Sequence, residues 1–172
     1  SYPRYPDNEY LERGIYSKNE SSVKSNSLDV LLKEKCVLVL GEAGYGKTYE
    51  SIILLQKACT NENTRTLIPV FIPLREYGLL YTDIIGGIKY KISPFCDGEI
   101  EEFIEHQLKN GRYLLIFDGI DDITQDTYRT KFYDEFRNFS AQYNNNYFFI
   151  TSRINCYHGE LGEKKQYFLT AL

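Results

Sequence analysis

One octapeptide constrains the fold of this chain more than any other feature. Residues 41–48 read Gly-Glu-Ala-Gly-Tyr-Gly-Lys-Thr and match the pattern G-x-x-x-x-G-K-[ST]. A short apolar run rich in β-forming residues, 36–40, comes directly before them, and a largely apolar helical stretch, 47–59, follows. The sequence therefore predicts a buried strand, a glycine-rich loop and a helix in succession, which is the start of an α/β domain.

A loop of this composition is suited to hold a chain of phosphates. Glycines allow backbone N–H groups to converge on phosphate oxygens, and the helix N-terminus adds partial positive charge. Lys47 would reach the β- and γ-phosphates as a point charge, and the Thr48 hydroxyl would ligate Mg²⁺. We therefore expect ATP or ADP to be held by the loop and the start of the helix: Gly41, Glu42, Ala43, Gly44, Tyr45, Gly46, Lys47, Thr48 and Tyr49.

A cluster of acids follows the second clear apolar run. Residues 112–117 lead into Asp118, and Asp121 and Asp122 come shortly after. The carboxyl end of a buried parallel strand is the edge at which open α/β sheets bind ligands. We predict that Asp118 holds Mg²⁺ and that Asp121 and Asp122 serve the metal or the attacking water. The alternative is that acids here cap the next helix, a role open to Asp122 or Thr124.

A third predicted strand, residues 147–151, runs into Ser152 and Arg153. It should lie beside the strand that ends at Asp118, so its polar end would face the γ-phosphate. Arg153 could contact that phosphate with a planar, two-pronged donor group. The alternative is an ordinary surface arginine.

Alternating strands and helices predict a parallel sheet with helices on both faces. Residues 1–26 show no clear period and are expected to form an arm or linker, and residues 27–172 the α/β core. Ser27 is expected to cap a helix over 28–35, and Asp97 the helix that ends before Gly111. Pro69 and Pro73 cannot donate ladder hydrogen bonds, which places their strand, 67–73, at a sheet edge. The last strand is expected at 166–169.

The composition of the chain limits the kinds of partner and cofactor that it can bind. The formal net charge of −4 argues against a nucleic-acid binder. Four scattered cysteines indicate neither a zinc site nor a disulfide framework, and no apolar stretch is long enough to span a membrane, so a cytoplasmic protein is expected. The chain begins with Ser and contains no Met, which we interpret as a fragment of a longer protein.

These elements together resemble the NACHT family of signal-transduction NTPases, of the STAND class. The segments GEAGYGKT, LLIFDGIDDI, FITSR and IPVFIPLRE are similar to the family's phosphate loop, acidic strand, sensor and second strand, and the resemblance covers residues 28–172. It implies a three-layer P-loop fold with a mostly parallel five-stranded sheet in the order 5-1-4-3-2. It also implies catalytic roles for Asp121, Asp122 and Arg153, with Mg²⁺ held by Thr48 and Asp118. Where the family usually has Glu, this chain has Asp122, so hydrolysis is expected to be slow.

The resemblance further implies a nucleotide-controlled switch, in bacteria one of innate immune or antiphage defence. The chain would end before the family's helical lid, and it is expected to be monomeric, whereas the full-length protein is expected to oligomerise on activation. No N-K-x-D segment for guanine is present, which favours adenine. Two alternatives remain: a non-catalytic nucleotide-binding scaffold and a GTP-dependent P-loop enzyme.

Overall fold

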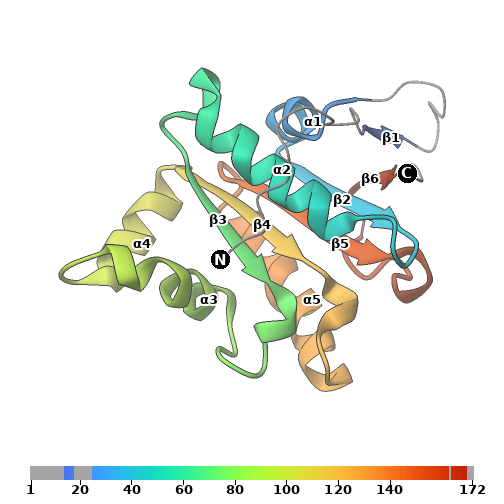
Figure 1. Cartoon of the computed structure of the whole chain (residues 1–172). Coiled ribbons are helices and arrows are strands. Elements are labelled where there is room, and N and C mark those ends of the chain that lie inside the picture. The colour runs from blue at the N-terminus through green and yellow to red at the C-terminus, as the bar shows by residue number, and fades with distance from the viewer. Residues whose placement is uncertain (1–13, 18–24, 163, 170–172) are drawn as a thin grey trace.

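A six-stranded, mostly parallel sheet forms the centre of the protein (Figure 1). The computed structural model describes residues 14–17, 25–162 and 164–169. The sheet has the order β1-β6-β2-β5-β4-β3, in which β1 is antiparallel to β6 and the other neighbours are parallel. Its strands are β1 (Ile15–Ser17), β2 (Cys36–Gly41), β3 (Ile68–Pro73), β4 (Tyr113–Asp118), β5 (Tyr147–Arg153) and β6 (Lys165–Leu169).

The prediction of five strands is wrong in count, and the complete order differs accordingly. The extra strand, β1, comes from the segment predicted to be an arm. Ile15 is fully buried, and its backbone exchanges two hydrogen bonds with Ser25, so this short segment gains a core contact that its lack of periodicity did not show. Residues 1–13 and 18–24 of the predicted arm lie outside the described residues. The five parallel strands are, from one side to the other, the fifth, first, fourth, third and second along the chain, and β3 lies at the sheet edge as its prolines predict.

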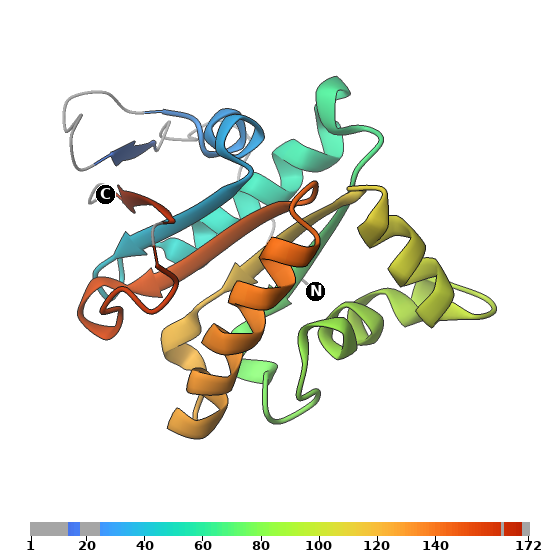
Figure 2. The same ribbon diagram turned by 180° about the vertical axis from the view of Figure 1, so that it is seen from behind.

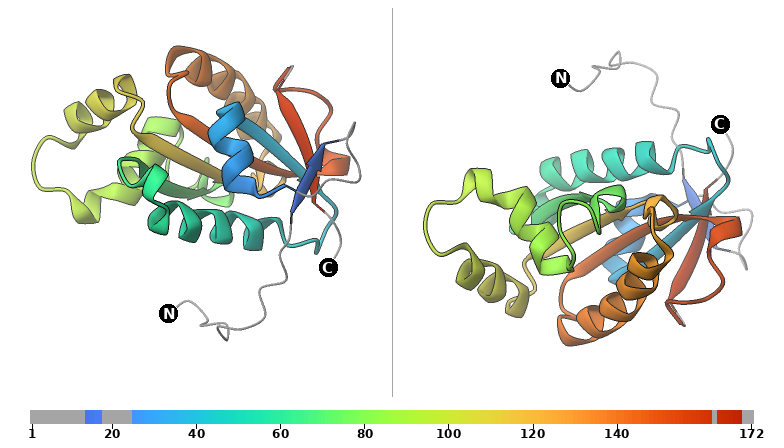
Figure 3. Two further views of the ribbon diagram at one scale, coloured as in Figure 1. Left: turned by 90° about the horizontal axis from the view of Figure 1, so that it is seen from above. Right: turned by 90° about the horizontal axis from the view of Figure 1, so that it is seen from below.

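Helices cover both faces of the sheet and complete three layers (Figures 2 and 3). Alternate residues of β2 point to opposite faces: Val37 and Val39 pack with α1 and α2, whereas Leu38 and Leu40 pack on the side of α3, α4 and α5. The helices are α1 (Ser27–Glu34), α2 (Lys47–Thr60), α3 (Ile84–Ile92), α4 (Ile100–Lys109) and α5 (Asp126–Gln142). Single 3₁₀ turns are η1 (Glu62–Thr64), η2 (Leu74–Glu76), η3 (Ser93–Phe95), η4 (Ile120–Asp122) and η5 (Ile154–Cys156).

Two predicted helix caps are wrong. Asn26, which has an extended backbone, caps α1 by accepting a hydrogen bond from the Leu28 N–H at 2.9 Å. Ser27 is already helical, and its buried hydroxyl donates to Glu50 of α2 instead. Helix α4 starts after Glu99 without a side-chain cap, because Asp97 lies too far upstream of its first turn.

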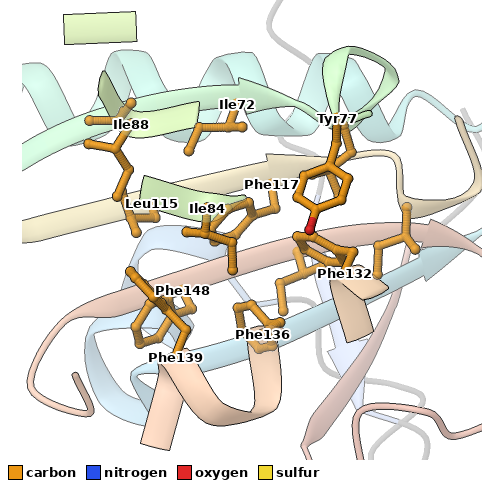
Figure 4. Close-up of a cluster of buried hydrophobic side chains, with 14 of the residues drawn as sticks. Ile72, Tyr77, Ile84, Ile88, Leu115, Phe117, Phe132, Phe136, Phe139 and Phe148 are labelled. Atoms are coloured by element: carbon orange, nitrogen blue, oxygen red, sulfur yellow. The ribbon is translucent and has the colours of Figure 1, made fainter. Parts of the chain in front are cut away.

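An aromatic cluster fixes α5 against the strands that carry the acids and Arg153 (Figure 4). Phe132 and Phe136 both contact Phe117 of β4, with ring centroids 5.7 Å apart in each pair. Phe136 also meets Phe148 of β5 at 5.6 Å, edge to face. The aromatic face of this helix therefore holds β4 and β5 in place beneath the candidate site.

The described part of the chain, 14–17, 25–162 and 164–169, contains no helix that combines the length and apolar character needed to cross a bilayer.

Candidate functional site

The glycine-rich loop joins β2 to α2, as predicted. Gly44 and Gly46 have φ values of 79° and 78°, a left-handed conformation that side chains with a Cβ rarely adopt. Helix α2 begins directly at Lys47, and its N-cap residue, Gly46, offers no side-chain acceptor. Because Gly46 provides no cap, an external anion is a natural acceptor for N–H groups at the start of this helix.

Lys47 lies folded over this loop. Its ammonium donates to the carbonyl oxygens of Gly41, at 3.2 Å, and Glu42, at 3.0 Å. Both acceptors are neutral backbone groups, so the positive charge stays available to a ligand at the loop. The outer part of the loop is exposed at Glu42, Ala43 and Gly44, whereas Tyr45, Gly46 and Tyr49 are half-buried.

Asp118 lies at the carboxyl end of β4 and is only 5% exposed. Its carboxylate accepts three hydroxyl hydrogen bonds: from Thr48 at 2.7 Å, and from Ser51 and Thr151 at 2.9 Å each. The first bond joins the two residues predicted to hold the metal, although they lie 70 positions apart in the chain. The structure thus places Thr48 and Asp118 in direct contact.

Sequence reasoning missed Ser51 as part of this cluster. It lies three residues after Thr48, on the same side of α2, and is fully buried. The helical spacing of the two hydroxyls is the signal that could have revealed it. Together with Thr151, Ser51 fixes the orientation of the Asp118 carboxylate.

The chain turns sharply after Asp118. Gly119 adopts φ 79°, and its N–H donates to the Thr151 hydroxyl at 2.9 Å. A Cβ at this position would lie 2.5 Å from Asp122 Oδ2, which is closer than atoms can approach without moving. The glycine therefore lets the Asp122 carboxylate fold back over the end of β4.

The acid that ends β4 and the two that follow it occupy different surroundings, and none of them caps α5. That helix begins at Asp126 after Gln125, which makes no side-chain cap bond, so the capping alternative for Asp122 or Thr124 is wrong. Asp121 is paired with Arg153: its Oδ1 accepts from the Arg153 backbone N–H at 2.9 Å, and its Oδ2 lies 2.8 Å from Nε. Arg153 is half-exposed and lies opposite Gly41 in the β2–β5 register.

Asp122 is the exposed acid of η4, although part of its side chain lies against Gly119. Partial burial raises the pKa of its carboxyl, and the negative charges of Asp121 and Asp118 raise it further. The positive charges of Arg153 and Lys47 act in the opposite direction. Asp122 therefore interacts with the other four charged side chains that the sequence predicted at this edge of the sheet.

Within the described residues, no group of three or more His, Cys, Asp or Glu side chains is arranged to hold an ion. The hydroxyl of Thr48 and the carboxylate of Asp118 are instead ligand types that Mg²⁺ takes where phosphates and water complete its coordination. The residues present fit such a magnesium ion.

Comparison with known proteins does not assign the chain to a family. No family model matches the sequence, and no curated protein sequence matches it. Among solved structures, the chain resembles PCH-2 of C. elegans with a TM-score of 0.46 and 12% sequence identity. The match covers 83% of this chain and 36% of that chain, so this chain spans about a third of the length of that protein. A similarity this low does not support a conclusion about function.

Proposed function

We propose that this chain is a nucleotide-binding module that takes up a purine nucleoside triphosphate with Mg²⁺ and hydrolyses it slowly. The observation that carries the proposal is the 2.7 Å hydrogen bond from the Thr48 hydroxyl to Asp118. It brings the first turn of the loop helix to the acid at the end of β4. A hydroxyl and a carboxylate in contact beside an anion-binding loop are the protein's share of a magnesium–phosphate site.

The loop would bind the phosphates through its backbone and Lys47. The uncapped N-terminus of α2 supplies N–H donors, and the Lys47 ammonium already lies above the loop carbonyls. A phosphate oxygen is a stronger acceptor than a neutral carbonyl, so the ammonium would exchange those bonds for the ligand.

Thr48 and Asp118 would hold the magnesium ion, Thr48 through its hydroxyl and Asp118 through the ion's water shell. When bound, Mg²⁺ neutralises charge on the β- and γ-phosphates. Ser51 and Thr151 would keep the Asp118 carboxylate in one orientation, because each donates to its Oδ1 atom at 2.9 Å.

Asp122 would orient the attacking water. It is the exposed carboxylate of the turn, and it interacts electrostatically with both Lys47 and Arg153. Its side chain is one methylene shorter than the glutamate usual in NACHT proteins. Water would therefore be held less closely, which supports slow hydrolysis over fast turnover.

We further propose that the module is a NACHT-type switch, in which the nucleotide state controls a larger signalling protein of innate immune or antiphage defence. Its support is the set of motifs around Lys47, Asp118 and Arg153, together with the arrangement β6-β2-β5-β4-β3 of the parallel strands. A non-catalytic nucleotide-binding scaffold is the second candidate. It is favoured by the short Asp122 side chain, and measured turnover separates the two.

Calorimetry on the wild type and Lys47→Ala tests the site. A charged hydrogen-bond partner contributes about 1.5–3 kcal/mol, so Lys47→Ala should weaken Mg-ATP binding by roughly tenfold to a hundredfold. Lys57→Ala is the matched control, because this exposed lysine lies near the other end of the same helix. Equal affinities of the wild type and Lys47→Ala would refute the site.

A further inference from the structure

The Asp121–Arg153 pair stands next to the glycine-rich loop. Strand β5 lies between β2 and β4, and Arg153 is its last residue, directly opposite Gly41 at the start of the loop. Asp121 is the middle residue of η4, the turn that follows β4. Arg153 is thus placed between the loop after β2 and the acids after β4.

Asp121 uses both carboxylate oxygens on this one residue. Oδ1 accepts from the Arg153 backbone N–H at 2.9 Å, and Oδ2 accepts from the side-chain Nε at 2.8 Å. The two bonds hold the main chain and the guanidinium of Arg153 relative to each other, so they limit the directions in which the side chain can extend. Because the side-chain bond is made at Nε, the two terminal NH₂ groups provide four further N–H donors.

Asp121 and Asp122 differ in how far their side chains are buried. The Asp121 side chain is 4% exposed, whereas the Arg153 side chain is 50% exposed. A carboxylate that orients a water molecule has to offer an accessible oxygen to it, and the Asp121 oxygens are covered and bonded to Arg153. Asp122 is the exposed acid. The two carboxylates therefore suit different tasks, although they are neighbours in sequence.

We propose that Asp121 is a positioning residue, which orients the Arg153 guanidinium toward the γ-phosphate of a bound triphosphate and does not orient the attacking water. This inference rests on the proposed function. The terminal N–H groups of Arg153 bind the γ-phosphate as a two-pronged donor, and Asp121 supplies the fixed geometry that such a contact needs. Asp121 thereby makes the site sensitive to the presence of the third phosphate.

The consequence is measurable as a ratio of affinities. ADP lacks the γ-phosphate, so a residue that acts through Arg153 affects binding of ATP and leaves binding of ADP nearly unchanged. A residue with a merely structural role would weaken both alike. The ratio of ATP to ADP affinity therefore distinguishes positioning of Arg153 from general support of the fold.

The test is calorimetry of the whole chain with Mg-ATP and Mg-ADP, for the wild type, Asp121→Ala, Arg153→Ala and the double variant. Loss of the arginine contact should lower the affinity ratio by about tenfold or more. Asp121→Ala should lower it by at least roughly threefold, since a free arginine still reaches the phosphate part of the time. The double variant should be no worse than Arg153→Ala, because both changes remove the same contact.

Asp134→Ala is the matched control, since it removes an exposed Asp–Arg pair on α5, Asp134 with Arg137, and should leave the ratio unchanged. Should Asp121→Ala fail to fold, Asp121→Asn decides: its amide oxygen can accept from the Arg153 N–H, but its NH₂ group cannot accept from Nε. A wild-type ratio in the folded Asp121 variant overturns the inference while leaving the proposed function intact. A wild type that binds neither nucleotide overturns both.

Discussion

Gly119→Ala would test how the turn after β4 places the Asp122 carboxylate. Gly119 has φ 79°, where an alanine costs about 1–2 kcal/mol. Its new Cβ would lie 2.5 Å from Asp122 Oδ2, and ordinary contact requires at least 3.4 Å, so the carboxylate has to move by about 1 Å. The carboxylate is the end of a flexible side chain, so this movement adds little to the loss of stability.

The two effects should appear in different measurements. A loss of about 1–2 kcal/mol should lower the Tm by roughly 2–8 °C for a chain of this size. Displacing a water-orienting group by about 1 Å can reduce a rate on the order of a hundredfold. We therefore expect Gly119→Ala to melt slightly earlier, to bind Mg-ATP within about threefold of the wild type, and to lose nearly all turnover.

Gly162→Ala is the matched control for this prediction. Gly162 has φ 69°, and a Cβ there would meet nothing within 4 Å. It should show a similar fall in Tm but wild-type turnover. Thermal melts, calorimetry and steady-state phosphate release on the three proteins complete the assay. Wild-type turnover in Gly119→Ala, or an equal loss of turnover in Gly162→Ala, would refute the reasoning.

Four further predictions concern magnesium binding, turnover, the preferred nucleobase and the pH dependence of stability. Asp118→Ala should abolish the difference between the ATP affinity measured with magnesium and that measured with EDTA, and calorimetry that shows an unchanged magnesium dependence would contradict the role of Asp118. Asp122→Ala should leave ATP binding unchanged in calorimetry but abolish turnover in a phosphate-release assay. ATP should displace a fluorescent nucleotide analogue from the site at lower concentration than GTP does. A tenfold preference for GTP would contradict the prediction of adenine. Burial raises the pKa of Glu135, which accepts from the Tyr77 hydroxyl and the Ile84 N–H at 2.5 and 2.6 Å. The folded protein then holds this proton more tightly than the unfolded chain, so the stabilisation is largest in acid and is lost as pH rises through the raised pKa. The Tm advantage of the wild type over Glu135→Gln should shrink from acid to neutral pH, and a constant difference would contradict it.

Local chemistry alone predicted the main parts of the site. A glycine-rich loop between an apolar run and a helical stretch has few other uses, and β2, the loop and α2 lie where the sequence placed them. The sequence predicted that Asp118 lies at this site, because an acid that ends a buried parallel strand has to lie at the carboxyl edge of the sheet. Pro69 and Pro73 predicted that β3 lies at the sheet edge, because proline has no backbone N–H and an inner strand must donate hydrogen bonds to a neighbouring strand on each side.

Other features depend on contacts between distant segments, which no local pattern encodes. Ile15 becomes part of β1 only because β6 offers it an open strand edge. Ser51 joins the site only because α2 packs directly against Asp118, and Asp121 differs from Asp122 only because β5 brings Arg153 within 2.8 Å of one of them. Residue type and spacing thus determined which side chains reach this edge of the sheet. The packing of β4, β5 and α2 decided which of them are bonded to one another, because hydrogen bonds depend on distances of a fraction of an ångström that sequence spacing does not specify.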